Sequence, residues 1–193
     1  MGQHDEAHLY LQKASDMRQE LLESAPDQGI YNPHLVREWC TLAGYLWLKG
    51  DYSTAWKYAD DSTKLGEEIY PKDSLNLLQC YTVLGNILNS QGKLEESKRL
   101  HLKSLDICTH HYGDHPDTAF ACHRYGKILA EEGNTLGAID YVKRAIEILS
   151  DYPCLEAANA RSNYYLSKLF DKAAKGINLT MEDFDKLVNY SDW

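Results

Sequence analysis

The stretch LQCYTVLGNILNSQGKLEESKRLHLKSLDICTHHYGDHPDTA, residues 78–119, contains the pattern that decides the fold. It predicts a helix, a glycine turn, a longer helix and a loop with a proline. The chain repeats this pattern on both sides, with a small anchor residue in each first helix and a turn glycine seven residues later. The anchors are Ala43, Gly85 and Gly126, and the turn glycines are Gly50, Gly92 and Gly133. Spacings of 42 and 41 residues between anchors are typical of a solenoid, whose units bury their apolar faces only against their neighbours.

The two helices of each repeat have complementary surfaces. The first helix of the first full repeat carries Trp39, Leu42, Ala43 and Leu46 in a large-large-small-large pattern at helical spacing. The second helices carry a stripe of mostly small residues, which allows antiparallel helices to approach closely. The stripe comprises Ala55, Ala59 and Ser62 in the first full repeat, Ser97, His101 and Ser104 in the second, and Ala138, Val142 and Ala145 in the third.

Composition limits the partners of the chain. Its 193 residues are 44% hydrophobic and 25% charged, with a formal net charge of −9. This acidity disfavours nucleic acid and anionic membrane surfaces as partners, because both bind through clustered lysine and arginine. The sequence has no run of about 20 apolar residues and no apolar signal core in Met1–Tyr10. We therefore expect no nucleic-acid partner and no membrane partner.

The cysteines indicate a reducing compartment. All five are scattered and none forms a CxxC pair: Cys40, Cys80, Cys108, Cys122 and Cys154. An odd, scattered set is typical of free thiols in a cytosolic or nuclear protein, so we expect a cytoplasmic location.

The repeat pattern also predicts the domain organisation. We expect a repeat array over residues 1–173, with a partial repeat at 2–32, full repeats at 33–74, 75–116 and 117–153, and a capping helix at 154–173. Gln3–Ser24 has helical spacing of apolar residues but lacks a first-helix partner. This truncated start indicates a segment of a longer protein.

The C-terminal end departs from the pattern. Asn159 and Asn163 fall at the expected packing positions of a helix over residues 155–170, which is typical of a solvated capping helix. We expect Lys175-Gly176 to end this helix. Residues 174–193 are predicted to form a short helix or tail that begins with a capping box at Thr180–Asp183.

Trp39-x-x-Leu42-Ala43, with Ala55 twelve residues after Ala43, resembles the tetratricopeptide repeat signature. The long second helices and the loop Tyr112–Ala119 resemble the kinesin-light-chain-like variety of this family. The resemblance covers roughly residues 2–170. It implies an all-α fold, a right-handed α-α superhelix of antiparallel helix pairs, whose first helices line a concave groove for an extended peptide or a partner helix.

The resemblance also implies which residues face the groove. Besides Gly44, the groove residues are Arg37, Thr41, Trp47, Asn86, Asn89, His123, Arg124 and Lys127. This arrangement implies a non-enzymatic scaffold that binds a protein or peptide partner. The alternative is a sensor or oligomerisation arm of a larger switch protein, for example of the nucleotide-binding immune type, that packs against its own chain or forms a homo-oligomer.

The groove departs from two known patterns of the family. Kinesin light chains carry paired asparagines before the Leu-small step, whereas this chain has Cys40-Thr41, Thr82-Val83 and His123-Arg124. Of the cationic clamp that holds chaperone tails, only Arg124 is present. Arg124 and Lys127 would attract an acidic peptide through charge-assisted hydrogen bonds. We therefore expect specificity in the third repeat, while Trp47 is interpreted either as a groove residue or as core between repeats.

Other chemistry is disfavoured. His4 and His8 are four residues apart, and His110, His111 and His115 are close in sequence, but neither group has the stereotyped spacing of a closed zinc site. Acid pairs such as Glu95-Glu96 are typical of solvated helix faces, and the sequence has no phosphate loop or nucleophile motif. We expect no catalytic residues, no metal site, no cofactor and no enzymatic activity.

Overall fold

The computed structural model describes residues 9, 10, 12, 13, 16, 17, 20, 24 and 32–177. Residues 32–177 are all-α, as the sequence predicts, and contain no strand. Their helices are α2 (Asn32–Lys49), α3 (Tyr52–Ile69), α4 (Leu75–Ser90), α5 (Leu94–Tyr112), α6 (Pro116–Glu131), α7 (Thr135–Ser150), the 3-10 turn η2 (Pro153–Leu155) and α8 (Glu156–Ile177). Among the described helices, none has the length and apolarity that crossing a bilayer requires.

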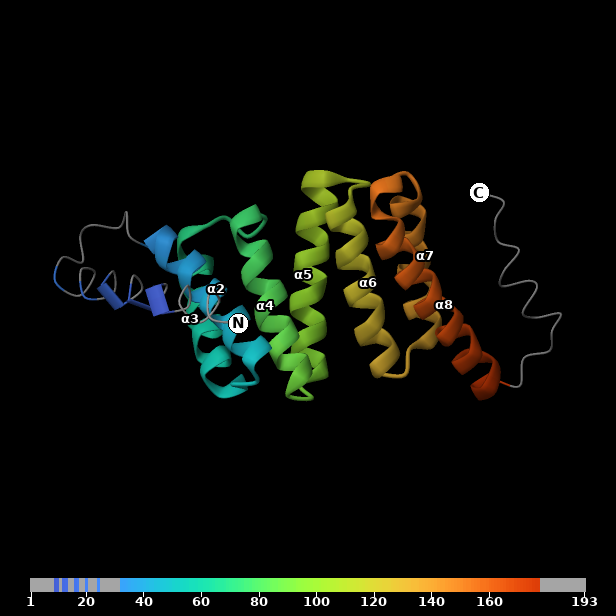
Figure 1. Cartoon of the computed structure of the whole chain (residues 1–193), viewed down its shortest axis with the longest axis horizontal. Coiled ribbons are helices and arrows are strands. Elements are labelled where there is room, and N and C mark those ends of the chain that lie inside the picture. The colour runs from blue at the N-terminus through green and yellow to red at the C-terminus, as the bar shows by residue number, and fades with distance from the viewer. Residues whose placement is uncertain are drawn as a thin grey trace. The chain divides into compact units, whose positions relative to one another are not determined.

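The chain divides into two compact units, Met1–His111 and Tyr112–Trp193. In the described part of the first unit, α2 pairs with α3 and α4 pairs with α5 (Figure 1). In the second unit, α6 pairs with α7, and α8 packs against α7 (Figure 1). Each unit is therefore built from helix pairs of the kind that the repeat pattern predicts.

The three helix pairs are joined by the same turn. At the end of α2, the Gly50 amide donates to the Trp47 carbonyl at 3.0 Å and the Asp51 amide donates to the Leu46 carbonyl at 3.0 Å. These two bonds define a Schellman motif, which needs a positive φ at the glycine. Gly50, Gly92 and Gly133 have φ values of 85°, 75° and 92°, and equivalent bonds close the other two turns. The prediction that glycine is needed at these corners is confirmed.

The small stripe of the second helices forms the core of each unit. Every one of its nine residues is buried. In the first unit, Ala55 and Ala59 pack with Ala43 and Ile87, and the Ser97 hydroxyl donates to the Gly85 carbonyl at 2.8 Å. The predicted interlocking of small second-helix faces with the first helices is therefore confirmed.

The glycine anchors are small because the partner helix leaves no room for a side chain. A Cβ atom added to Gly85 would lie 2.7 Å from Nε2 of the buried His101. A Cβ atom added to Gly126 would lie 2.9 Å from Cγ2 of Val142. Both distances are shorter than a Cβ atom tolerates. The close approach of the two helices therefore explains why glycine recurs at this position of the repeat.

The structure shows both the packing face and the length of helix α8. Asn159 is half-buried and Asn163 is exposed, so neither is a packing residue. Leu169, Phe170 and Ser162 are buried instead. The helix also continues through Lys175-Gly176 to Ile177. A glycine costs a helix only about 1 kcal/mol, which is too little to end it.

Several predictions fall outside the described residues. These are the start of the partial repeat at Gly2, the histidines His4 and His8, the capping box at Thr180–Asp183 and the short C-terminal helix or tail. They remain predictions.

Candidate functional site

Five of the eight predicted groove residues belong to the first unit. Arg37 and Thr41 are exposed on α2, and the Thr41 hydroxyl donates to the Arg37 carbonyl at 2.8 Å. Arg37 lines a cleft of about 300 Å³ between α2 and α4, together with His34, Gln79 and the two thiols Cys40 and Cys80. Thr41 is not part of this cleft lining. The α2–α4 cleft thus has one arginine as its permanent charge.

Trp47 packs between the first two repeats. Its ring packs against the core of the first unit beside Ala43 and Leu88. Its Nε1 donates to the hydroxyl of Ser90 on α4 at 2.9 Å. The side chain is half-buried, and its one hydrogen-bond donor is already used within the protein. The structure therefore favours the interpretation of Trp47 as packing between repeats.

Asn86 and Asn89 lie on α4 and are half-buried. The backbone carbonyl of Asn86 accepts a hydrogen bond from the Ser90 hydroxyl at 3.0 Å. The side-chain oxygen of Asn89 is buried and has no hydrogen-bond partner within the described part of the chain. Neither asparagine lines the α2–α4 cleft.

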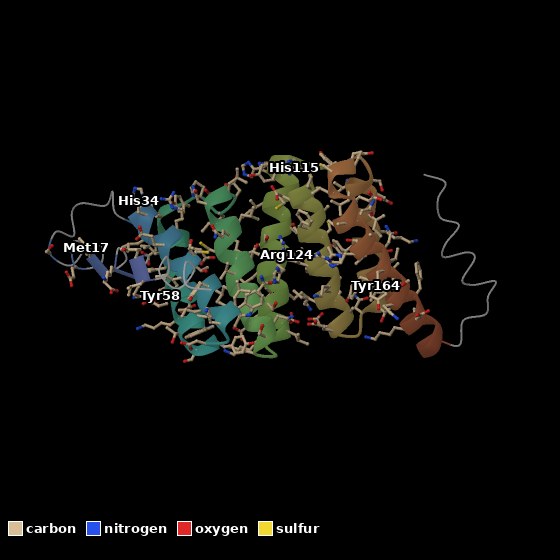
Figure 2. All side chains as sticks on the ribbon, in the orientation of Figure 1. Met17, His34, Tyr58, His115, Arg124 and Tyr164 are labelled. Carbon is tan, nitrogen blue, oxygen red and sulfur yellow. The ribbon has the colours of Figure 1, made fainter. Side chains whose placement is uncertain are left out.

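The other three predicted groove residues meet in the second unit. His123, Arg124 and Lys127 lie on α6 and line a cleft of about 260 Å³ between α6 and α8. Arg124 is labelled in Figure 2. The remaining lining residues are Phe120 from α6 and Ala158, Arg161 and Ser162 from α8. We call this the α6–α8 cleft.

The α6–α8 cleft is strongly cationic. Arg124, Lys127 and Arg161 line it, and none of its seven lining residues is acidic. Burial lowers the pKa of His123 below its ordinary value, and the positive charges of Lys127, Arg124 and Arg161 lower it further. His123 is therefore neutral at pH 7, and the permanent charge of the cleft comes from the two arginines and the lysine.

His123 is held in place from α8. Its Nδ1 lies 3.0 Å from the hydroxyl of the buried Ser162, and its ring centroid lies 5.4 Å from that of Tyr165. These contacts fix the imidazole at the floor of the cleft, beside the three cations.

The described helix pairs correspond to a known family. Residues 81–151 match the sequence model of the tetratricopeptide repeat. The helix pairs of this stretch are therefore tetratricopeptide repeats. Tetratricopeptide repeats generally mediate protein–protein interactions, and their proteins are typically non-enzymatic scaffolds. No curated protein sequence matches the chain.

Solved structures share this tetratricopeptide-repeat fold. BtubC (BKLC) from P. vanneervenii is 16% identical with a TM-score of 0.67, and the match covers 88% of this chain and 66% of that one. A putative kinesin light chain with nearly identical TPR-like repeats from Podosopora anserina is 14% identical with a TM-score of 0.68, covering 91% of this chain and 87% of that one. Aspartyl phosphate phosphatase F from Bacillus subtilis is 14% identical with a TM-score of 0.64, covering 86% and 45%. The fold thus occurs in proteins of different function, and the site must be argued from its own residues.

The tetratricopeptide-repeat register contains a signal for Arg161, which the sequence analysis missed. Extending the 41-residue period by one repeat beyond Gly126 leads to Ser167. Arg161 precedes Ser167 by six residues, as Arg37 precedes the anchor Ala43. The two arginines therefore occupy equivalent positions in the first helices α2 and α8, and each lines a cleft.

The histidines of the repeat loop do not share one role. His115 is the N-cap of α6, and its Nδ1 accepts a hydrogen bond from the Asp117 amide at 3.2 Å. His110 and His111 lie in the last turn of α5 rather than in the loop. These two histidines therefore do not share the loop position of His115.

Proposed function

We propose that this tetratricopeptide-repeat protein is an interaction scaffold that binds an acidic segment of a partner protein in the α6–α8 cleft. The observation that carries the proposal is the convergence of Arg124, Lys127 and Arg161 on one concavity without an acidic neighbour in its lining. Such a concentration of positive charge is unusual on a chain with a net charge of −9.

The chemistry of the lining favours carboxylates as ligands. Arginine presents a planar fork of donors that pairs with a carboxylate through two parallel hydrogen bonds, and two arginines line the cleft. Phe120 and Ala158 add apolar surface beside the charges. A peptide with acidic side chains next to an apolar one matches both features.

The α2–α4 cleft gives a useful contrast within the same chain. Its lining contains Arg37 as the one arginine and no lysine, and it includes Val36, Tyr70 and Leu75. Charge-assisted hydrogen bonds contribute roughly 1.5–3 kcal/mol each where they are desolvated. Three cations therefore support much stronger attraction for an acidic segment than one, and we assign the specificity to the second unit.

The test is a binding titration with a defined acidic probe. A fluorescein-labelled oligoglutamate peptide is titrated with the full chain and followed by fluorescence anisotropy. We expect Arg161→Glu to weaken binding by about tenfold or more, because it removes one charge-assisted contact and adds repulsion. Arg161 is exposed, so the substitution leaves the core intact.

The matched control is Arg99→Glu, which makes the same charge change on an exposed arginine of α5 in the first unit. We expect it to leave the affinity within about twofold, because only the screened net charge changes. Equal loss in both variants, or no loss in Arg161→Glu, would contradict the assignment to the α6–α8 cleft. An oligolysine peptide serves as the probe of opposite charge, and Arg161→Glu is expected not to weaken its binding.

A further inference from the structure

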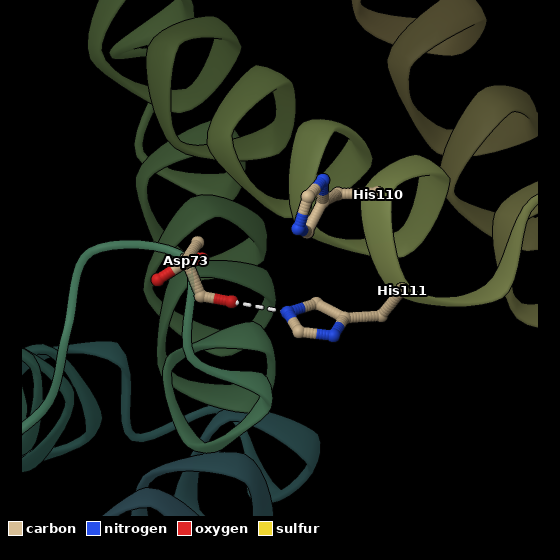
Figure 3. A group of neighbouring side chains, drawn as sticks. All are labelled: Asp73, His110 and His111. Carbon is tan, nitrogen blue, oxygen red and sulfur yellow. Dashed lines mark hydrogen bonds between the residues drawn. The ribbon is translucent and has the colours of Figure 1, made fainter.

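Three side chains that could ligate a metal ion converge in the first unit, away from the clefts described above. Asp73, His110 and His111 each offer a ligand atom, and these atoms lie within 4.8 Å of one another. Figure 3 shows the two imidazole rings beside the Asp73 side chain. Within residues 32–177, this is the one group of three histidine, cysteine or acidic side chains with such spacing.

The backbone on both sides of the group is fixed by hydrogen bonds. Asp73 lies in the turn between α3 and α4, which is closed by a bond from the Ser74 amide to the Pro71 carbonyl at 2.9 Å. Ser74 also caps α4 by accepting from the Asn76 amide at 3.3 Å. His110 and His111 lie in the last helical turn of α5. The ligands are therefore attached to defined elements.

His111 already bridges the two elements. Its Nε2 lies 2.6 Å from the backbone carbonyl oxygen of Asp73 (Figure 3). The imidazole is thus held toward the turn before any ion is present. An ion bound through this nitrogen would replace the hydrogen bond, and the carbonyl oxygen would then be a further oxygen donor within its reach.

The electrostatic setting favours a cation. The C-terminal end of α5 carries the negative end of its helix dipole, which stabilises positive charge in the last turn. The Asp73 carboxylate adds a formal negative charge to the same place. A divalent ion would therefore be stabilised by the helix end as well as by its direct ligands.

The set of two imidazoles and one carboxylate selects the class of ion. Zinc and its neighbours in the first transition row accept such mixed nitrogen and oxygen ligands, whereas Mg²⁺ and Ca²⁺ prefer oxygen alone. In tetrahedral zinc sites the ligand atoms are about 3.4 Å apart, since each lies about 2.1 Å from the ion. The three side chains need to approach by roughly an ångström, and all three are exposed and can do so.

We propose that Asp73, His110 and His111 form a binding site for Zn²⁺ or a similar transition-metal ion. Three protein ligands leave a coordination position for water, so the ion would be exchangeable rather than structural. Binding would connect the α3–α4 turn to the end of α5 and stabilise the first unit by mass action.

The test is isothermal titration of the untagged full chain with ZnCl₂. We expect one zinc site. Asp73→Asn and His110→Ala are each expected to weaken zinc binding by about tenfold or more, because even the loss of a group that only supports a ligand costs about that much affinity. Asp73→Asn keeps the backbone carbonyl that His111 contacts, so it removes the anionic ligand without removing that hydrogen bond.

Two controls separate this site from other histidines. His34→Ala removes an exposed histidine of α2 outside the group, and His4→Ala/His8→Ala removes the pair near the N-terminus. Both are expected to keep the wild-type affinity, and MgCl₂ is expected to give no binding heat. Absence of zinc binding, equal affinity in Asp73→Asn, or loss of binding in His4→Ala/His8→Ala would overturn the proposal.

A second measurement keeps the test independent of binding heats. Zinc is expected to raise the thermal unfolding midpoint of the wild-type chain, followed by circular dichroism, and to raise that of Asp73→Asn by less at the same zinc concentration. An equal rise in both proteins would also overturn the proposal.

Discussion

In the α6–α8 cleft, His123 is affected both by burial and by the neighbouring positive charges. Its burial and the three cations around it disfavour the imidazolium in the folded chain, so its pKa is lower than in the unfolded chain. The folded state therefore binds fewer protons than the unfolded state as pH falls below about 6.5. Stability that is fully present above this pH is lost as the pH falls toward the lowered pKa.

An anion bound in the α6–α8 cleft is expected to raise the pKa of His123 again. Carboxylates in the cleft would stabilise the imidazolium, so binding takes up a proton and the affinity for oligoglutamate increases as pH falls. We expect a gain of about twofold to fivefold between pH 7.5 and pH 5.5, the range of a partly exposed ion pair. Anisotropy titrations across this interval measure it. The groups that face His123 are Arg124 and Lys127 on α6 and Arg161 and Tyr165 on α8.

His123→Asn provides the matched comparison, because asparagine can still bond to the Ser162 hydroxyl but cannot titrate. Its pH dependence of binding is expected to be flat over the same interval. A pH dependence as steep as that of the wild type would show that another group titrates.

Two glycines within helices separate packing from helix propensity. A Cβ atom at Gly85 would lie 2.7 Å from Nε2 of His101, whose ring is buried, whereas nothing lies within 4 Å of the Cβ position at Gly44. We expect Gly85→Ala to lower the free energy of unfolding by about 1–3 kcal/mol through overpacking. Gly44→Ala is expected to raise it by up to about 1 kcal/mol, because alanine is the better helix former.

Urea denaturation of both variants measures these free energies. Stabilisation in both would mean that the His101 ring can move away from Gly85 at little cost. Such a result would contradict the explanation of the small anchor residue.

At the scale of elements, the recurring unit is a helix pair closed by a Schellman turn. The Gly92 amide donates to the Asn89 carbonyl at 2.9 Å, and the Lys93 amide donates to the Leu88 carbonyl at 3.0 Å. Nothing lies within 4 Å of a Cβ atom at Gly92, and its φ is 75°. The need for glycine there is therefore conformational and not steric contact with another element.

Substitutions at Gly92 can distinguish these two causes. We expect Gly92→Ala to lower the free energy of unfolding by about 1–2 kcal/mol, the cost of the left-handed conformation for a residue with a Cβ atom. Gly92→Asn is expected to cost less, since asparagine adopts this conformation more readily. Chemical denaturation measures both, and an equal cost would indicate a steric cause instead.

At the scale of the whole molecule, charge is distributed unevenly. The chain carries a net charge of −9, yet the α6–α8 cleft is lined by three cations and no acid. The two clefts between first helices also differ, with Arg37 alone in one and three permanent cations in the other. The backbone pattern thus repeats along the chain, but the charges that line the clefts do not. The binding chemistry of each cleft depends on its own side chains.

The sequence by itself determined the elements. The spacing of the anchor residues and turn glycines predicted the helix pairs and their turns. A positive φ in the turn favours glycine, and a close helix approach requires a small residue at the anchor, so both features can be read from the local sequence. His123, Arg124 and Lys127 were expected to be together, because residues three or four apart share a helix face. The assignment of these residues to a binding groove stays a proposal.

Only the tertiary structure decided which residues lie opposite His123, Arg124 and Lys127. Arg161 and Ser162 are about a repeat away in sequence, and the packing of α6 and α8 against α7 brings them to the same cleft. Asp73 meets His110 and His111 because an α3–α4 turn and a helix end come together. Such contacts depend on the path of the backbone between distant segments, which no local spacing in the sequence expresses.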